Sequence, residues 1–308
     1  MTRMPQRTVS TTKKAMPNNN LKIVFFGTGP LAESVLFAMY NAGYVPTLVV
    51  TKPDSLVGRH QELTPPHIKK WCELKGIPVY QPEKLKDLGA DSPIFTNNFD
   101  LAVVASYGKI IPENVLGAPK HGFLNVHPSM LPLYRGPSPI ESQLLDGLTE
   151  IGISIMKLDA GMDSGPILVQ SKISIRNDDT AGTLEIKCGQ IGGEMLTQCI
   201  DHYVTGALIP KDQDHNAATI CKFIEKSQGE IHLTGDIKTI KNKYRALTPW
   251  PGIFFFYEHA GKSIRVKINK FKLNENTLDE CIESITPEGK AEMSWADFKN
   301  GYTVTTLQ

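Results

Sequence analysis

The sequence lacks the long apolar run that a membrane-spanning helix needs. No stretch reaches the about 18–20 consecutive apolar residues required to cross a bilayer. Of the 308 residues, 41% are hydrophobic and 21% are charged, a balance typical of a soluble globular chain. The net charge is only +1, so any binding of a polyanion must come from a local patch. We therefore expect no membrane contact and one large domain or two ordinary ones.

Paired cysteines and clustered metal ligands are also missing. The five cysteines are an odd number and no two stand at CxxC spacing, which argues against a disulfide framework or a zinc knuckle and fits a reducing cytosol. No HExxH motif occurs, and we expect no metal. No GxSxG motif occurs either, so a nucleophilic serine on a strand-to-helix elbow is excluded.

The first twenty residues have no acid and no apolar signal core. They carry Arg3, Arg7, Lys13 and Lys14, whereas the first acid of the chain is Glu33. A secretory signal is therefore excluded. We expect residues 1–20 to form a disordered basic extension of a cytoplasmic protein of bacterial type. The alternative is a transit peptide, which would place the protein in an organelle matrix.

Apolar strands that alternate with helical segments dominate the chain from residue 21 to residue 206. The run 21–26 (LKIVFF) leads into a Gly-Thr-Gly-Pro turn and then a helix at 31–41. Further strands are predicted at 47–51, 78–81, 101–106, 122–127, 152–158 and 167–174, and a closing helix at 180–204. This order predicts a Rossmann-like α/β domain with a mostly parallel sheet at 21–206.

Beyond a linker predicted at 207–217, the composition becomes basic. Residues 238–272 hold nine Lys or Arg against one acid, Glu258. Two strands, 253–258 and 263–271, flank a short turn and predict a β-hairpin. We expect a smaller β domain at 218–308. The basic stretch either contacts nucleic-acid phosphates or is the solvated face of the hairpin.

Polar side chains interrupt the central strand 122–127. Asn125 and His127 lie two residues apart and so on the same face, and Asp163 follows in a glycine-rich turn at 159–165. An amide donor, an imidazole and a carboxylate suit a reaction in which an oxyanion develops and a proton moves. The residues alone leave another interpretation open, a hydrogen-bonded core pair of Asn and His with an unrelated turn aspartate.

Two motifs in this region resemble the signature of the folate-dependent formyltransferases. They are N-V-H-P-S-x-L-P-x-Y-R-G-x-x-P-I at 125–140 and D-A-G-M-D-S-G-P-I-L at 159–168. The resemblance covers about residues 21–206. It implies formyl transfer from 10-formyltetrahydrofolate, with Asn125, His127 and Asp163 as catalytic residues. It also implies that the folate contacts Ser129, Met130, Leu131, Pro132, Tyr107 and Gly108.

Three further motifs resemble those family members that formylate methionyl-initiator tRNA. They are PDSLVGRH at 53–60, ALTPWPG at 246–252 and P-E-G-K-x-x-M-S-W-x-D-F-x-x-G at 287–301. This implies a monomer with a C-terminal OB-like domain, shortened here between the last two motifs. The tRNA contacts implied are Lys52, Arg59, Arg135, Lys241, Lys243, Arg245, Lys262, Arg265 and Lys267. For Arg135, holding the loop that contains it is an equal alternative.

Two other functions remain open at this level. One is a formyltransferase that acts on an amino sugar nucleotide, glycinamide ribonucleotide or another small amine, against which the basic hairpin argues. The other is a tRNA- or folate-binding protein without turnover. The set of Asn125, His127 and Asp163 argues against it, because a pure binder has no need of an oriented imidazole.

Overall fold

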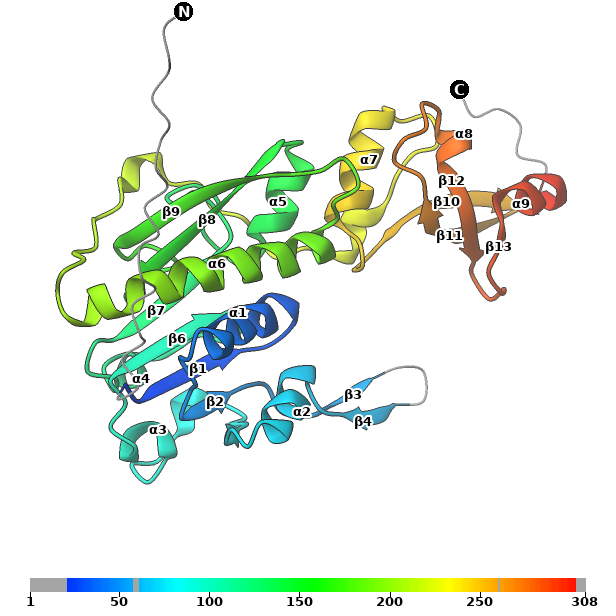
Figure 1. Ribbon diagram of the computed structural model, residues 1–308. Coiled ribbons are helices and arrows are strands. Elements are labelled where there is room, and N and C mark those ends of the chain that lie inside the picture. Colours follow the sequence, from blue (N-terminus) through cyan, green and yellow to red (C-terminus); the bar gives the residue numbers. More distant parts are fainter. Residues whose placement is uncertain (1–20, 58–60, 260, 303–308) are drawn as a thin grey trace, which may run out of the picture.

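A computed structural model describes residues 21–57, 61–259 and 261–302. The predictions for residues 1–20 and for Arg59 lie outside these ranges. The chain forms two units, a large one built on a seven-stranded sheet and a small one built on a four-stranded sheet (Figure 1). Among the described residues, no helix is both long and apolar enough to cross a membrane.

The large sheet has the strand order β5-β2-β1-β6-β7-β8-β9. The first five strands in this order pair in parallel, and β8 and β9 are antiparallel to their neighbours. The predicted, mostly parallel Rossmann-like sheet is thus confirmed. The strands are β1 (Ile23–Gly27), β2 (Leu48–Val50), β5 (Val79–Tyr80), β6 (Leu101–Ala105), β7 (Phe123–His127), β8 (Glu150–Lys157) and β9 (Ile167–Ser174).

Helices cover both faces of this sheet, which is why its central strands read as unbroken apolar runs. On one face, α1 (Pro30–Asn41) and α6 (Ala181–Val204) lie side by side (Figure 1) and bury side chains such as Phe25 and Leu184. On the other face, Phe26 and Val115 belong to a second apolar cluster. The remaining helices of the large unit are α2 (His67–Leu74), η1 (Leu85–Asp87), α3 (Pro93–Thr96), α4 (Glu113–Leu116) and α5 (Pro139–Leu145).

The segment that contains the motif at 53–60 includes a β-hairpin. Strands β3 (Ser55–Val57) and β4 (Glu62–Thr64) pair in antiparallel register, with Leu56 opposite Leu63. Both leucines are more than half exposed. The hairpin extends away from the sheet on the side of the small unit (Figure 1). Strands of three residues carry too little periodicity to be recognised from sequence.

The small unit is an open antiparallel sheet in the order β10-β11-β12-β13. One face packs on α9, where Phe255 meets Trp295 and Phe298 in edge-to-face contacts. The smaller β domain predicted after the linker is therefore confirmed, with four strands among the described residues. Its elements are α7 (Ile237–Ala246), β10 (Ile253–His259), β11 (Lys262–Phe271), α8 (Leu278–Cys281), β12 (Ile282–Pro287), β13 (Met293–Ser294) and α9 (Trp295–Tyr302).

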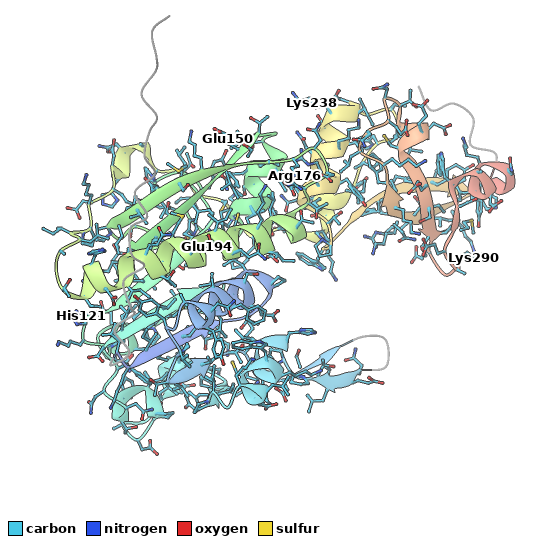
Figure 2. All side chains as sticks on the ribbon, in the orientation of Figure 1. His121, Glu150, Arg176, Glu194, Lys238 and Lys290 are labelled. Carbon is cyan, nitrogen blue, oxygen red and sulfur yellow. The ribbon has the colours of Figure 1, made fainter. Side chains whose placement is uncertain are left out.

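Helix α7 joins the small unit to the large one. It packs against α5, and the Arg245 guanidinium donates to the carbonyls of Asp179 and Arg176, both at 2.9 Å. Figure 2 shows Arg176 at this junction, whereas Lys238 and Lys290 point outward on the small unit. The domain bounds 21–206 and 218–308 remain a prediction. Two short 3-10 helices, η2 (His215–Ala217) and η3 (Lys226–Gly229), lie between the two sheets in the chain.

Candidate active site

Strand β7 places Asn125 and His127 on one side of the large sheet. The strand lies between β6 and β8, and side chains two residues apart along it point the same way. Asn125 is partly exposed, whereas His127 is only 4% exposed. A buried imidazole needs hydrogen-bond partners, and the partners of His127 define the site.

The turn after β8 brings Asp163 to these two residues. The Asp163 carboxylate lies 3.4 Å from Asn125 Nδ2 and 3.7 Å from His127 Nδ1, and it accepts a 2.8 Å hydrogen bond from the Gly136 amide. Asp159 instead closes the turn by accepting from the Ser164 hydroxyl at 2.9 Å. Of the two acids in the predicted turn, Asp163 is therefore the one that meets Asn125 and His127.

The second ring nitrogen of His127 fixes its tautomer. Nε2 lies 2.9 Å from the Tyr134 carbonyl oxygen, which can only accept, so Nε2 must carry a proton. Nδ1 then faces the Asp163 carboxylate. At 3.7 Å, Nδ1 is too far from the carboxylate for a hydrogen bond to it, so this edge of the ring is not tied up by Asp163.

Internal hydrogen bonds hold the loop between β7 and α5 in place. The Ser129 hydroxyl donates to the Leu133 carbonyl at 2.6 Å, and Ser154 donates to the Ser129 carbonyl at 2.6 Å. The Leu131 amide donates to Ser154, and its carbonyl accepts from Gln170. The polar groups of Ser129 and Leu131 are thus used within the protein, whereas Met130 and Pro132 are partly exposed.

Gly152 on β8 makes room for this loop. A Cβ at position 152 would clash with the backbone of Met130. Its amide donates to Gln143, whose side-chain nitrogen in turn donates to the Pro128 carbonyl at 2.9 Å. The loop predicted to bind folate therefore rests directly on the sheet.

Tyr107 and Gly108 follow the carboxyl end of β6. The Tyr107 ring is 2% exposed and packs edge-on against Phe26 at 5.5 Å between ring centroids. Burial raises the pKa of its hydroxyl to about 12, and this hydroxyl finds no hydrogen-bond partner among the residues described. Gly108, at φ +68°, is exposed beside the Lys52 ammonium. Of this predicted folate-contacting pair, Gly108 is the one at the surface.

Arg135, which the sequence predicts either to contact tRNA or to hold its own loop, is buried. It is 8% exposed. Its Nε and Nη2 donate to Gln213 Oε1 at 3.1 and 2.7 Å, and Nη2 lies 3.1 Å from His215. The structure therefore favours the alternative role, in which Arg135 holds its loop.

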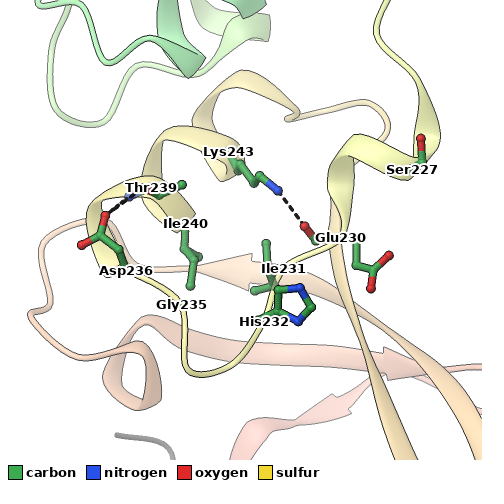
Figure 3. A pocket seen from close by; sticks show the side chains of 9 residues that line it. All are labelled: Ser227, Glu230, Ile231, His232, Gly235, Asp236, Thr239, Ile240 and Lys243. Atoms are coloured by element: carbon green, nitrogen blue, oxygen red, sulfur yellow. Dashed lines mark hydrogen bonds between the residues drawn. The ribbon is translucent and has the colours of Figure 1, made fainter.

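The cations on α7 are likewise engaged inside the protein. Lys241 donates to the Glu275 carbonyl at 2.6 Å, and Lys243 to the Glu230 carbonyl at 2.8 Å. Figure 3 shows Lys243 and Glu230 in the wall of a hollow of about 370 Å³ that lies within residues 227–243. Burial lowers the pKa of Arg245. All three cations are partly buried and help to hold α7 in place, and their contact with tRNA stays a prediction.

The β10–β11 hairpin presents three further predicted cations. Lys262 and Lys267 are exposed, and the Arg265 guanidinium lies 3.8 Å from the centroid of the Phe254 ring. Lys267 stands opposite Phe254, and Arg265 opposite the half-exposed Phe256. Arg265, Lys267 and these two aromatic rings share one sheet face, and such a combination suits a nucleic-acid strand.

The sequence reasoning missed Gln213, which lies in the predicted linker. Its amide nitrogen donates to the carbonyls of Asp163 and Gly165. A polar residue in a predicted linker carries no local sign of burial, so nothing in the sequence pattern indicated it. Within the described ranges, no group of three or more His, Cys, Asp or Glu side chains is placed to hold a metal ion.

Comparison with known proteins identifies the family of the chain. Residues 21–200 match the model of the formyl transferase family, and residues 223–280 match the formyl transferase C-terminal domain. A methionyl-tRNA formyltransferase of Thermodesulfovibrio yellowstonii is 37% identical over 298 residues, which cover 91% of this chain and 95% of that protein.

Solved structures share the fold. A methionyl-tRNA formyltransferase from Clostridium thermocellum aligns with a TM-score of 0.54 at 16% identity, over 89% of this chain and 99% of that one. A 4-N formyltransferase from Francisella tularensis aligns with a TM-score of 0.60 at 19% identity, over 79% of this chain and 95% of that one. The identity and coverage of the relatives show that the chain belongs to the methionyl-tRNA formyltransferase family.

Proposed function

We propose that this enzyme transfers the formyl group of 10-formyltetrahydrofolate to the α-amino group of methionyl-initiator tRNA. The observation that carries the proposal is the convergence of Asn125 and His127 on the Asp163 carboxylate, at 3.4 and 3.7 Å. It stands in a chain that resembles methionyl-tRNA formyltransferases over most of its length. The product, formylmethionyl-tRNA, would be used in translation initiation.

The three residues have separate roles in this reaction. Asn125 has two N–H groups and uses one toward Asp163, so the other can donate to the formyl oxygen as negative charge develops there. Protonated at Nδ1, His127 adds a second donor at the same edge. Such donors each lower the barrier by about 2.7–4 kcal/mol.

The Asp163 carboxylate collects the proton that the α-amine loses as nitrogen attacks the formyl carbon. The bond between the formyl carbon and N10 of the folate breaks, and N10 takes up a proton, so that the numbers of atoms and charges balance. Tyr134 contributes through its carbonyl, which holds Nε2 and keeps His127 turned toward Asp163. Asp163 thus serves as orienting group and as general base.

The residues of the loop at 128–133 fit a flat heterocycle. Met130 and Pro132 offer partly exposed apolar surface, and the hydrogen bonds of Ser129 and Leu131 hold the loop rigid before any ligand arrives. A pre-formed apolar wall with few polar groups is typical of small-molecule sites. We propose that the pterin ring lies against this loop, with Gly108 at its rim.

The tRNA would be held by the β10–β11 hairpin. Lys262, Arg265 and Lys267 offer positive charge, and the ring of Phe256 is half exposed beside them. Phosphate contacts of this kind weaken as the salt concentration rises, because the counterions that they release gain less entropy in concentrated salt. We propose that the enzyme acts as a monomer, in the cytoplasm or in an organelle matrix with bacterial-type translation.

The experiment is an acceptor assay with the purified chain. Methionyl-initiator tRNA and 10-formyltetrahydrofolate should yield formylmethionyl-tRNA, whereas an amino sugar nucleotide or glycinamide ribonucleotide should yield no formylated product. If the enzyme formylates a sugar nucleotide and does not formylate the tRNA, the sugar nucleotide becomes the proposed acceptor. Binding of tRNA and folate without any product would reduce the protein to a binding module.

A further inference from the structure

Gln213 is a buried amide whose hydrogen bonds all lead to the candidate active site. It is 7% exposed. Nε2 donates to the Asp163 carbonyl at 2.9 Å and to the Gly165 carbonyl at 2.7 Å, while Oε1 accepts from Nε and Nη2 of Arg135. Both N–H groups and the oxygen are therefore satisfied, as a buried polar network requires.

The backbone of Asp163 needs such support. Its φ is +47°, a left-handed conformation that costs free energy for a residue with a Cβ and persists where the surroundings enforce it. The two carbonyls that Gln213 holds lie on either side of Ser164, so its amide nitrogen clamps the turn around Asp163. Without the clamp, rotation of this backbone would swing the carboxylate away from His127.

Arg135 connects the clamp to the other side of the site. Gly136, the next residue, donates to the Asp163 carboxylate at 2.8 Å, and Tyr134, the preceding one, holds His127 through its carbonyl. The Arg135 amide donates to the Thr219 carbonyl at 2.9 Å, and the Cys221 amide to the Arg135 carbonyl at 2.8 Å. One side chain, Gln213, thus joins the turn that carries Asp163 to the loop that faces it.

The segment 211–221, which contains Gln213, is fastened at both ends. Lys211 exchanges two backbone hydrogen bonds with Ile167 on β9, at 2.7 and 2.8 Å. At the other end, the Thr219 hydroxyl accepts from the Tyr134 amide at 2.8 Å. The segment that carries Gln213 is therefore fixed on both sides of this residue. Its side chain can then hold the turn and the loop that it contacts.

We infer that Gln213 is a positioning residue for formyl transfer, which sets the Asp163 carboxylate against Asn125 and His127. The expected loss of kcat rests on the proposed function. The position of the Asp163 carboxylate does not, and it can be probed without any substrate. A merely structural glutamine would affect unfolding but would leave the chemistry of the folded enzyme unchanged.

Two variants test the inference. Gln213→Leu removes all four hydrogen bonds, and Gln213→Glu keeps an acceptor for Arg135 but places an oxygen opposite the carbonyls of Asp163 and Gly165. Both should lower kcat by up to about 10²-fold, since small displacements of a reacting group cost this much, with KM for folate and tRNA nearly unchanged. Asn216→Ala, at an exposed position of the same segment, serves as the matched control and should keep the wild-type kcat.

A double variant that includes Asp163→Asn distinguishes a positioning role of Gln213 from an effect on stability. In an Asp163→Asn background, Gln213→Leu should add little further loss, because residues that act as a unit are strongly non-additive. A full additional loss there, or a wild-type kcat in both Gln213 variants, would overturn the inference. Thermal unfolding of each variant shows that the assays compare folded proteins.

Hydrogen exchange at the Gly136 amide gives a readout that needs no substrate. This amide is held by the Asp163 carboxylate, so it should exchange faster in Gln213→Leu and at the wild-type rate in Asn216→Ala. Unchanged protection in Gln213→Leu would refute the inference whatever the acceptor assay shows. Absence of product from the wild-type enzyme, with the expected exchange pattern, would instead count against the proposed function alone.

Discussion

Glu185→Gln is predicted to stabilise the protein at neutral pH and to leave it unchanged in acid. Glu185 lies on α6 and faces the charge of Glu141 on α5. Burial raises the pKa of Glu185 from 4.5 to about 7, and repulsion from Glu141 adds to the rise. Burial also raises the pKa of Glu141. The native state therefore favours the neutral form of an acid that is charged when the chain unfolds.

The size of this change in stability follows from the linkage between proton binding and folding. Between pH 4.5 and about 7 the native state binds more protons than the unfolded state, so the free energy of unfolding falls as pH rises through this window. A rise in pKa from 4.5 to about 7 corresponds to about 3 kcal/mol, taken as an upper figure, at ~1.36 kcal/mol per pH unit. Glutamine is neutral at every pH. The variant should therefore gain this free energy of unfolding above the pH window and gain nothing below it.

Urea unfolding near pH 4.5 and near pH 8 provides the measurement. The variant should match the wild type at the lower pH and exceed it at the higher one. Glu194→Gln, at an exposed position on the same helix, is the matched control and should change stability by less than about 0.5 kcal/mol at either pH. An equal gain at both pH values would show that packing, rather than charge, explains the result, and no gain near pH 8 would refute the reasoning.

Further expectations concern the site and the two units. Asn125→Ala should lower kcat by about 10²–10³-fold through loss of one donor to the formyl oxygen, with thermal unfolding unchanged; a loss confined to KM would contradict the assigned role. Gly152→Ala should displace the Met130 backbone and cost about 1–3 kcal/mol of stability, measured by urea unfolding. It should also weaken folate binding in a fluorescence titration, and wild-type folate affinity would count against the loop as the pterin wall. Arg245→Ala removes two hydrogen bonds between the units and should expose the junction to limited proteolysis, whereas an unchanged digestion pattern would show that α5 and α7 hold the units together without it. Lys267→Ala should weaken tRNA binding and reduce the slope of log affinity against log salt by about 1, and an unchanged slope would exclude a phosphate contact at this position.

Much of the fold was readable because the large unit follows strong local patterns. The apolar runs at β1, β6 and β7 are long enough to predict buried strands, and the Thr180 cap with its reciprocal bonds to Thr183 marks where α6 begins. The strands β3 and β4 were not predicted because three residues are too few to show an apolar period.

The candidate site was only partly predictable. Asn125 and His127 share a strand, so their common side follows from the two-residue period alone. Asp163 stands 38 residues beyond Asn125 and could be joined to it by the resemblance of the motifs but not by periodicity. The bonds of the α7 cations to backbone carbonyls could not be predicted, because a lysine that donates to a carbonyl and a lysine that faces solvent look alike in sequence.

By itself, the sequence determined the mostly parallel sheet, the second β unit and the three side chains of the candidate chemistry, because local apolar periods and motif spacing encode them. The tertiary structure decided which nitrogen of His127 faces Asp163, that Arg135 is buried, and that Gln213 clamps the turn. The bonds behind these decisions join Arg135 to Gln213 across 78 residues and Gln213 to Asp163 across 50. Contacts at such separations arise when the chain folds, and no local pattern of residues records them.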